Sequence, residues 1–165
     1  MFKKRNINMK INDLIQEQDN LIAYKREFYL YPKYWETLSR VNIYKWETIQ
    51  FHEKNRKKIP ASPGIYTFVI NPSMVSHPQR YLFYIGKEET SLRDRFNDYL
   101  RGARDKTERP AILRLLKKWY GYLEFTYTLL DKTDLKSIES QLIDAFLPPC
   151  NKQVSSKIYK IIGAF

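Results

Sequence analysis

Two glycine-containing tripeptides constrain the fold of this chain most strongly. Gly64-Ile65-Tyr66 opens one apolar, aromatic run, and Tyr84-Ile85-Gly86 closes a second. Residues 65–70 and 81–85 have the composition of strands, and the segment between them is rich in turn residues. We therefore expect two strands, with Gly64 and Gly86 permitting turns or a close approach of the backbone.

Caps and periodicity predict the remaining elements. Ser91 with Asp94 resembles a capping box and starts a helix over 92–102, and Pro110 opens another helix to about 119. Residues 123–130 alternate as a third strand. Thr133 or Asp134 caps a helix to about 146, and an amphipathic helix is expected over 11–28. Residues 154–165 are compatible with a strand or a helix. This order predicts an α+β sandwich with a three-stranded, mainly antiparallel sheet flanked by helices.

The chain of 165 residues fits one domain with an extension. Pro60 and Pro63 mark a boundary, so we expect a basic, aromatic, partly helical extension over 1–60 and the main domain over 61–165. Lys and Arg number 29 against 18 Asp and Glu, a net charge of +11. A surplus of this size points to an anionic partner, most often nucleic acid, although an unspecialised basic surface has the same composition.

Several classes of site are disfavoured. The single cysteine, Cys150, excludes an intramolecular disulfide and a thiolate zinc cluster, and we expect it to be a small apolar filler. The two histidines, His52 and His77, lack metal-ligand spacing. The apolar runs are shorter than a membrane span, and no signal-peptide core follows the basic N-terminus, so we expect no membrane partner and a cytoplasmic protein.

Glu139 is the most informative single residue. At about 100° per residue, Leu135, Ile138, Leu142 and Phe146 form one helical stripe, and Glu139 falls inside it. A carboxylate that faces a core costs free energy unless it is paired or coordinates a metal. A structural salt bridge, for example to an arginine, remains the alternative.

Arg95 borders the apolar face that Leu92, Phe96 and Tyr99 form on the expected helix over 92–102. A guanidinium at the edge of a pocket can bind phosphate with two hydrogen bonds and neutralise charge in a transition state. The alternative is a surface ion pair with Asp98.

The two tripeptides, Arg95 with Tyr99, and the segment from Glu139 to Asn151 (E-S-Q-L-I-D-A-F-L-P-P-C-N) together resemble the GIY-YIG nuclease family. Members of this family are small domains that cut phosphodiester bonds with one divalent metal. The resemblance covers residues from about 62 to 151 and implies the small sandwich fold described above. The first 60 residues fall outside it.

The resemblance also implies roles for individual residues. Glu139 corresponds to the metal ligand, for Mg²⁺ with Mn²⁺ as a substitute, and one carboxylate suffices because Mg²⁺ takes water and phosphate oxygens as well. Arg95 stabilises the transition state, with Arg93 as the alternative because the preceding loop is about one residue longer than in some relatives. Tyr99 and Asn151 complete the pocket.

The two motif tyrosines are both candidates for the residue that acts on the attacking water. The resemblance places one of them next to the attacking water, as general base or orienter, and we favour Tyr66 over Tyr84. An unperturbed phenol titrates near pH ~10, so a general base would need a nearby cation that lowers its pKa. Lys87 directly follows the second tripeptide and is the expected cation, together with the metal.

The resemblance implies metal-dependent hydrolysis of DNA. We expect double-stranded DNA as the substrate and a restriction-like, phage or defence role, with a homodimer if both strands are cut. Basic side chains of the central region would track the phosphate backbone: Arg93, Arg101, Arg104, Lys106, Arg109, Arg114, Lys117 and Lys118. The extension could add DNA contacts or a dimer surface. A non-catalytic nucleic-acid-binding module on the same fold and a protein that binds an acidic partner are the competing hypotheses.

Overall fold

The computed structural model describes residues 11–30, 32–38, 44–72, 79–105, 109–152 and 158. Helices labelled α are α-helices and those labelled η are 3₁₀-helices. The elements in chain order are α1 (Ile11–Tyr24), α2 (Pro32–Trp35), η1 (Glu36–Leu38), β1 (Glu47–Gln50), η3 (Glu53–Lys58), β2 (Gly64–Ile70), β3 (Tyr81–Glu88), α3 (Leu92–Asp105), α4 (Pro110–Lys118), β4 (Leu123–Leu129) and α5 (Lys132–Phe146).

The strands form one antiparallel sheet in the order β1-β4-β2-β3. The expected order of strand, strand, helix, helix, strand and helix from β2 to α5 is confirmed. The expectation of three strands is wrong, because β1 pairs with β4 and adds a fourth strand from the segment before Pro60. β1 has only four residues, three of them exposed, so it lacks the alternation by which a strand is recognised in a sequence. The division of the chain at residue 60 stays a prediction.

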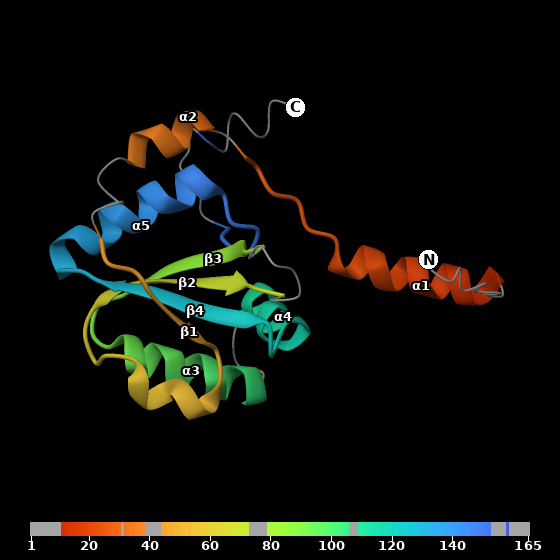
Figure 1. Ribbon diagram of the computed structural model, residues 1–165, viewed down its shortest axis with the longest axis horizontal. Coiled ribbons are helices and arrows are strands. Elements are labelled where there is room, and N and C mark those ends of the chain that lie inside the picture. Colours follow the sequence, from red (N-terminus) through yellow and green to blue (C-terminus); the bar gives the residue numbers. More distant parts are fainter. Residues whose placement is uncertain are drawn as a thin grey trace, which may run out of the picture.

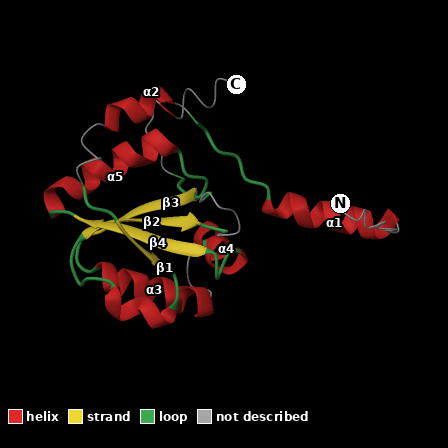
Figure 2. Ribbon diagram, in the orientation of Figure 1, coloured by secondary structure: helices red, strands yellow, loops and turns green. Residues whose placement is uncertain are grey.

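Helices cover both faces of the sheet (Figures 1 and 2), with α3 and α4 on one side and α5 with α2 on the other. The side chains of β2 alternate between two cores. Tyr66 and Phe68 enter the core under α3 and α4, whereas Ile65 enters the core under α5. β3 is an edge strand of the sheet, so its backbone is open to contacts from the segment that follows α5.

The ends of several helices differ from the expected ones. α1 ends at Tyr24, four residues before the expected 28, and it projects away from the rest of the protein (Figure 1). α5 starts at Lys132 with Asp131 as its N-cap, ahead of the expected cap at Thr133 or Asp134. Apart from the buried Ile158, residues 154–165 lie outside the described residues. None of the described helices has the length and apolarity needed to span a bilayer.

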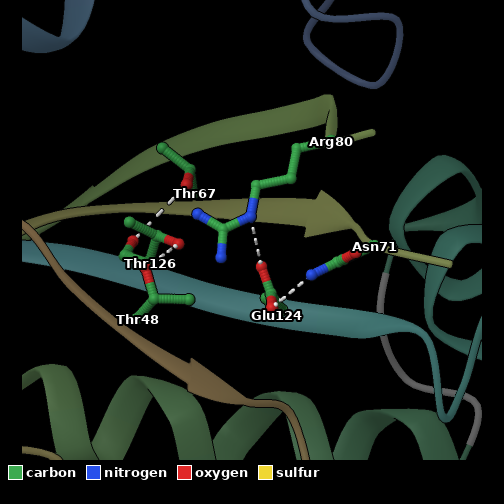
Figure 3. A network of polar contacts seen from close by, with 6 residues as sticks. All are labelled: Thr48, Thr67, Asn71, Arg80, Glu124 and Thr126. Atoms are coloured by element: carbon green, nitrogen blue, oxygen red, sulfur yellow. Dashed lines mark hydrogen bonds and ion pairs between the residues drawn. The ribbon is translucent and has the colours of Figure 1, made fainter. Parts of the chain in front are cut away.

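A network of polar side chains connects the strands of the sheet (Figure 3). Arg80 reaches across β2 to Glu124 on β4, with Nε and Oε2 3.2 Å apart, and Asn71 Nδ2 donates to Glu124 Oε1 at 2.8 Å. The hydroxyls of Thr48 and Thr126 lie 3.0 Å apart and connect β1 to β4. These contacts connect β1, β4 and the residues that follow β2 and precede β3 through polar side chains.

Candidate active site

Gly86 permits the closest contact between the two tripeptides. Tyr66 on β2 lies opposite Gly86 on β3, and the Tyr66 ring crosses over the glycine. A Cβ atom at Gly86 would lie 2.6 Å from the Tyr66 hydroxyl oxygen, which is closer than real Cβ contacts allow. Gly64 is equally confined, because a Cβ there would lie 2.3 Å from the Thr128 carbonyl oxygen. The expected close approach is therefore found at both glycines.

A β-bulge brings the second motif tyrosine to the same core. The register of β2 and β3 shifts between Phe68 and Val69, so that Tyr84 pairs with Phe68 and Leu82 pairs with Val69. Phe83 and Tyr84 consequently both enter the core under α3 and α4. An extra residue in one strand redirects side chains in this way, and such bulges are frequent beside active sites.

Arg95 on α3 joins two tyrosine hydroxyls. Its Nε donates to the Tyr66 hydroxyl at 3.2 Å and its Nη2 donates to the Tyr99 hydroxyl at 2.9 Å. The two hydroxyl oxygens lie 2.7 Å apart, and the guanidinium carbon lies 4.3 Å from the centre of the Tyr99 ring. Within the described part of the chain, Nη1 of Arg95 has no hydrogen bond. This half-buried guanidinium is therefore held by phenols and keeps one edge for a ligand.

Burial sets the protonation state of this cluster. It raises the pKa of the Tyr66 phenol well above its usual value, and the neighbouring Tyr84 adds to the effect. Arg95 lowers the pKa of Tyr66 through its charge and hydrogen bond without reversing the direction. Burial likewise raises the pKa of Tyr99. Both phenols are neutral at physiological pH, so the expected cation-lowered pKa of Tyr66 is not found.

Arg109 contacts Tyr84, a relationship that the sequence did not indicate. Its Nη2 donates to the Tyr84 hydroxyl at 2.8 Å, and its guanidinium carbon lies 5.7 Å from the centre of that ring. Arg109 is the N-cap residue of α4, directly before Pro110. It was expected only as a phosphate contact, yet it adds a second guanidinium, which is exposed, beside the motif tyrosines. The one available signal was its position immediately before a helix-starting proline.

Glu139 lies on the other side of β3 from the tyrosines. Its half-buried carboxylate accepts a hydrogen bond from the backbone N–H of Lys87. Burial raises the pKa of Glu139, while the charges of Lys87 and Arg109 lower it in part. The alternative of a structural salt bridge finds no support, since no residue in the described ranges lies within ion-pair distance of Glu139.

Lys87 acts on Glu139 rather than on Tyr66. Its ammonium group forms an ion pair with Glu89, and the charges of Glu89 and Glu139 contribute to its raised pKa. Successive strand residues point to opposite faces, so Lys87 faces the α5 side and Gly86 faces the Tyr66 side. Lys87 was expected beside Tyr66, but the structure places Arg95 there and Lys87 on the opposite face of the sheet.

Glu139 is a hard oxygen donor that the site offers to a metal. Among the described residues there is no group of three or more His, Cys, Asp or Glu side chains that could hold an ion. Glu139 alone fits Mg²⁺, which often takes one or two carboxylates and fills its other positions with water and phosphate oxygens. The raised pKa of Glu139 shows that burial leaves its negative charge incompletely compensated, which suits a cation ligand.

Asn151 fixes the backbone of the edge strand. Its Oδ1 accepts from the Ile85 N–H at 2.9 Å and its Nδ2 donates to the Ile85 carbonyl at 2.8 Å. The side chain thus replaces a neighbouring strand at the residue between Tyr84 and Gly86. The oxygen and the nitrogen of the carboxamide each bond the backbone of Ile85, as an orienting role requires.

The other basic residues are distributed around this centre. Arg93 Nε donates to the Ile59 carbonyl at 2.7 Å, so the structure places Arg95 and not Arg93 with the tyrosines. Arg101, Arg104 and Lys117 line a cavity of about 800 Å³ between α3, α4 and η3. Arg114 and Lys118 line another beside Cys150. Lys106 and His77 lie outside the described residues.

The solved structures that are similar to this chain include a GIY-YIG endonuclease domain. A crystal structure of the GIY-YIG N-terminal endonuclease domain of UvrC from Thermotoga maritima, bound to magnesium as its catalytic divalent cation, is 27% identical, with 61% of this chain and 98% of that chain covered and a TM-score of 0.42. A point mutant of the same domain, also bound to its catalytic divalent cation, is 26% identical, with 62% and 99% covered and a TM-score of 0.43. No family model and no curated protein matches the sequence.

Proposed function

We propose that this chain is a metal-dependent endonuclease of the GIY-YIG type that hydrolyses DNA phosphodiester bonds. One observation carries the proposal: residues 84–87 of β3 are flanked on one side by Arg95, Arg109 and the tyrosines, and on the other by Glu139. Cationic guanidinium groups and a carboxylate suited to a cation are the two features that phosphoryl chemistry needs in one place.

The chain's own residues then have the following roles. Arg95 offers its free Nη1 to a phosphate oxygen and neutralises charge that develops in the transition state, and Arg109 adds a second contact of this kind. Tyr66, as a neutral phenol held by Arg95 and Tyr99, orients the attacking water, with Tyr84 as the alternative. Asn151 keeps the β3 backbone in register with the site.

Glu139 would hold the divalent ion, Mg²⁺ or Mn²⁺, with Lys87 fixing the carboxylate through its backbone N–H. When bound, the ion would act as a Lewis acid for the scissile phosphate and the leaving oxygen. The similar UvrC domain binds magnesium as its catalytic cation. For this chain, the proposal of Mg²⁺ rests on Glu139 itself.

Double-stranded DNA, a restriction-like, phage or defence role and a cytoplasmic location complete the proposal. A homodimer would place two such sites on the two strands. The exposed apolar residues of the projecting α1, among them Leu14, Ile15, Leu21 and Ile22, would supply a contact surface for a second copy.

The experiment is incubation of purified protein with supercoiled plasmid in Mg²⁺, Mn²⁺ or EDTA. We expect nicking or linearisation with either metal and none in EDTA. Glu139→Gln should abolish it, and Asp134→Asn, an exposed carboxylate on the same helix, should not. Salt-sensitive DNA binding without any cleavage of plasmid, branched DNA, single strands or RNA would favour the non-catalytic binding module instead.

A further inference from the structure

A groove rich in aromatic side chains lies beside the site, where the end of α1 meets α4 and β3. Its volume is about 440 Å³, within the range of about 300–1,000 Å³ that is usual for small-molecule sites. Six of the lining residues are aromatic: Tyr24, Phe28, Tyr81, Phe83, Trp119 and Tyr122. Tyr24, Tyr81 and Tyr122 are 50%, 40% and 45% exposed, so their rings are open to a ligand.

Basic side chains are built into the same surface. The Arg26 guanidinium lies 5.1 Å from the centre of the Trp119 ring, and Lys118 Nζ lies 4.4 Å from the centre of the Tyr24 ring. Lys118 Nζ also donates to the Ala23 carbonyl at 2.7 Å, which holds the end of α1 against α4. Charge and ring faces thus alternate along one surface, as in sites that bind nucleic acid strands.

A second cavity adjoins this groove. It has a volume of about 410 Å³, shares Arg26 and Trp119 with the groove, and is also lined by Arg114, Lys118 and Cys150. Cys150 donates its backbone N–H to the Phe83 carbonyl at 3.0 Å, directly before Asn151 fixes Ile85. Together the two cavities form a path that runs from the basic residues beside Cys150 into the aromatic groove.

We propose that this path binds an unpaired nucleic acid strand, with phosphates on Arg26, Arg114 and Lys118 and bases stacked in the aromatic groove. The bases of a duplex already stack on one another, so their faces reach protein aromatic rings only when the strand is unpaired. The positive charge of the path favours this occupant over an apolar peptide or a second copy of the chain. Binding of an unpaired strand does not depend on the proposed nuclease function. One consequence rests on that function: the substrate of the nuclease has an unpaired strand next to the cleaved bond.

Fluorescence anisotropy in EDTA tests the binding without any cleavage, using a labelled single-stranded DNA oligonucleotide and the duplex of the same sequence. We expect tighter binding of the single strand, and a loss of about tenfold or more in its affinity in the Tyr24→Ala/Tyr122→Ala variant, with little change for the duplex. The matched control is Tyr120→Ala, which removes a ring that is 50% exposed and lies outside the groove.

Tryptophan fluorescence is a second readout, and it separates loss of the groove contact from loss of the fold. The single strand should quench the fluorescence of Trp119 in the wild type. The part of the quenching that disappears in Trp119→Phe reports contact at the groove. Phenylalanine at this position still offers a ring for stacking. Equal affinities for single strand and duplex, or unchanged single-strand binding in the double variant, would overturn the proposal. Dimer dissociation in that variant, seen by sedimentation, would assign the groove to a second copy and would also overturn it. An inactive protein that still shows the expected binding would refute the nuclease but not the groove.

Discussion

A Cβ atom at Gly86 would lie 2.6 Å from the hydroxyl oxygen of Tyr66, so the second tripeptide ends in glycine to make room for the tyrosine of the first. Gly86→Ala should displace the Tyr66 ring from Arg95 and Tyr99. Because overpacking a filled core costs about 1–3 kcal/mol, we expect a loss of that size in the free energy of unfolding, measured by urea titration. Plasmid cleavage should fall far more than stability does.

Gly121→Ala is the control for this variant. Gly121 has a φ of 94°, and a Cβ there would meet nothing within 4 Å. Alanine at Gly121 should cost about 1 kcal/mol through backbone strain alone, without loss of cleavage. Wild-type cleavage by Gly86→Ala would mean that the position of Tyr66 is irrelevant to the reaction.

Arg95→Lys should separate the geometry of the guanidinium from its charge. Lysine keeps the charge but cannot contact Tyr66, Tyr99 and a phosphate oxygen together. We expect the single-turnover cleavage rate to fall by about 10²–10³-fold, the usual effect of removing one transition-state donor. Arg93→Lys, two residues away on the same helix, should stay within tenfold of wild type. Equal losses in the two variants would count against Arg95 as the reacting arginine.

Tyr66→Phe and Tyr99→Phe each remove one of two hydroxyls that lie 2.7 Å apart. Each should lower stability by about 1 kcal/mol, because each breaks the same buried network. If Tyr66 orients the attacking water, only Tyr66→Phe should lower the cleavage rate, by about 10²-fold or more. Rate measurements on both variants decide the question, and a larger loss in Tyr99→Phe would reverse the assignment.

The raised pKa of Glu139 predicts how stability depends on pH without metal. The folded state binds this proton more tightly than the unfolded state does, so stability falls as pH rises from the ordinary carboxyl pKa through the raised value. Glu139→Gln carries no charge and should therefore melt at a higher temperature than wild type at about pH 7, with the difference vanishing near about pH 4. Thermal unfolding of the two proteins in EDTA, at neutral and at acid pH, measures this difference in melting temperature. A variant that is less stable at neutral pH would indicate a structural ion pair at Glu139.

Much of the fold follows from local pattern. The Ser91 cap is confirmed by the bond from the Asp94 N–H to Ser91 Oγ at 3.2 Å. Strand-like composition correctly placed β2 and β3, and alternation correctly placed β4. β1 was not predicted, because a short, exposed strand forms through its pairing with β4 and its own residues show no strand pattern. The bulge beside Tyr84 likewise depends on how two strands meet.

The site was predictable in its residue types more than in their contacts. Helical spacing alone placed Arg95 beside Tyr99, four residues later on α3. The contact of Arg109 with Tyr84 spans 25 residues, and no local spacing specifies such a pair. Lys87 was assigned to Tyr66 from chain proximity, although the period of two along a strand already directs it to the opposite face. The neutral state of Tyr66 depends on burial by several elements together, which the sequence around it does not specify.

The most direct test is the single-turnover rate of cleavage of end-labelled DNA, measured across a Mg²⁺ titration for wild type, Glu139→Gln and Asp134→Asn. We predict a rate that rises with Mg²⁺ to saturation in wild type and Asp134→Asn, and no cleavage by Glu139→Gln at any Mg²⁺ concentration. Cleavage by Glu139→Gln at the wild-type rate, or wild-type cleavage that persists in EDTA, would contradict the account.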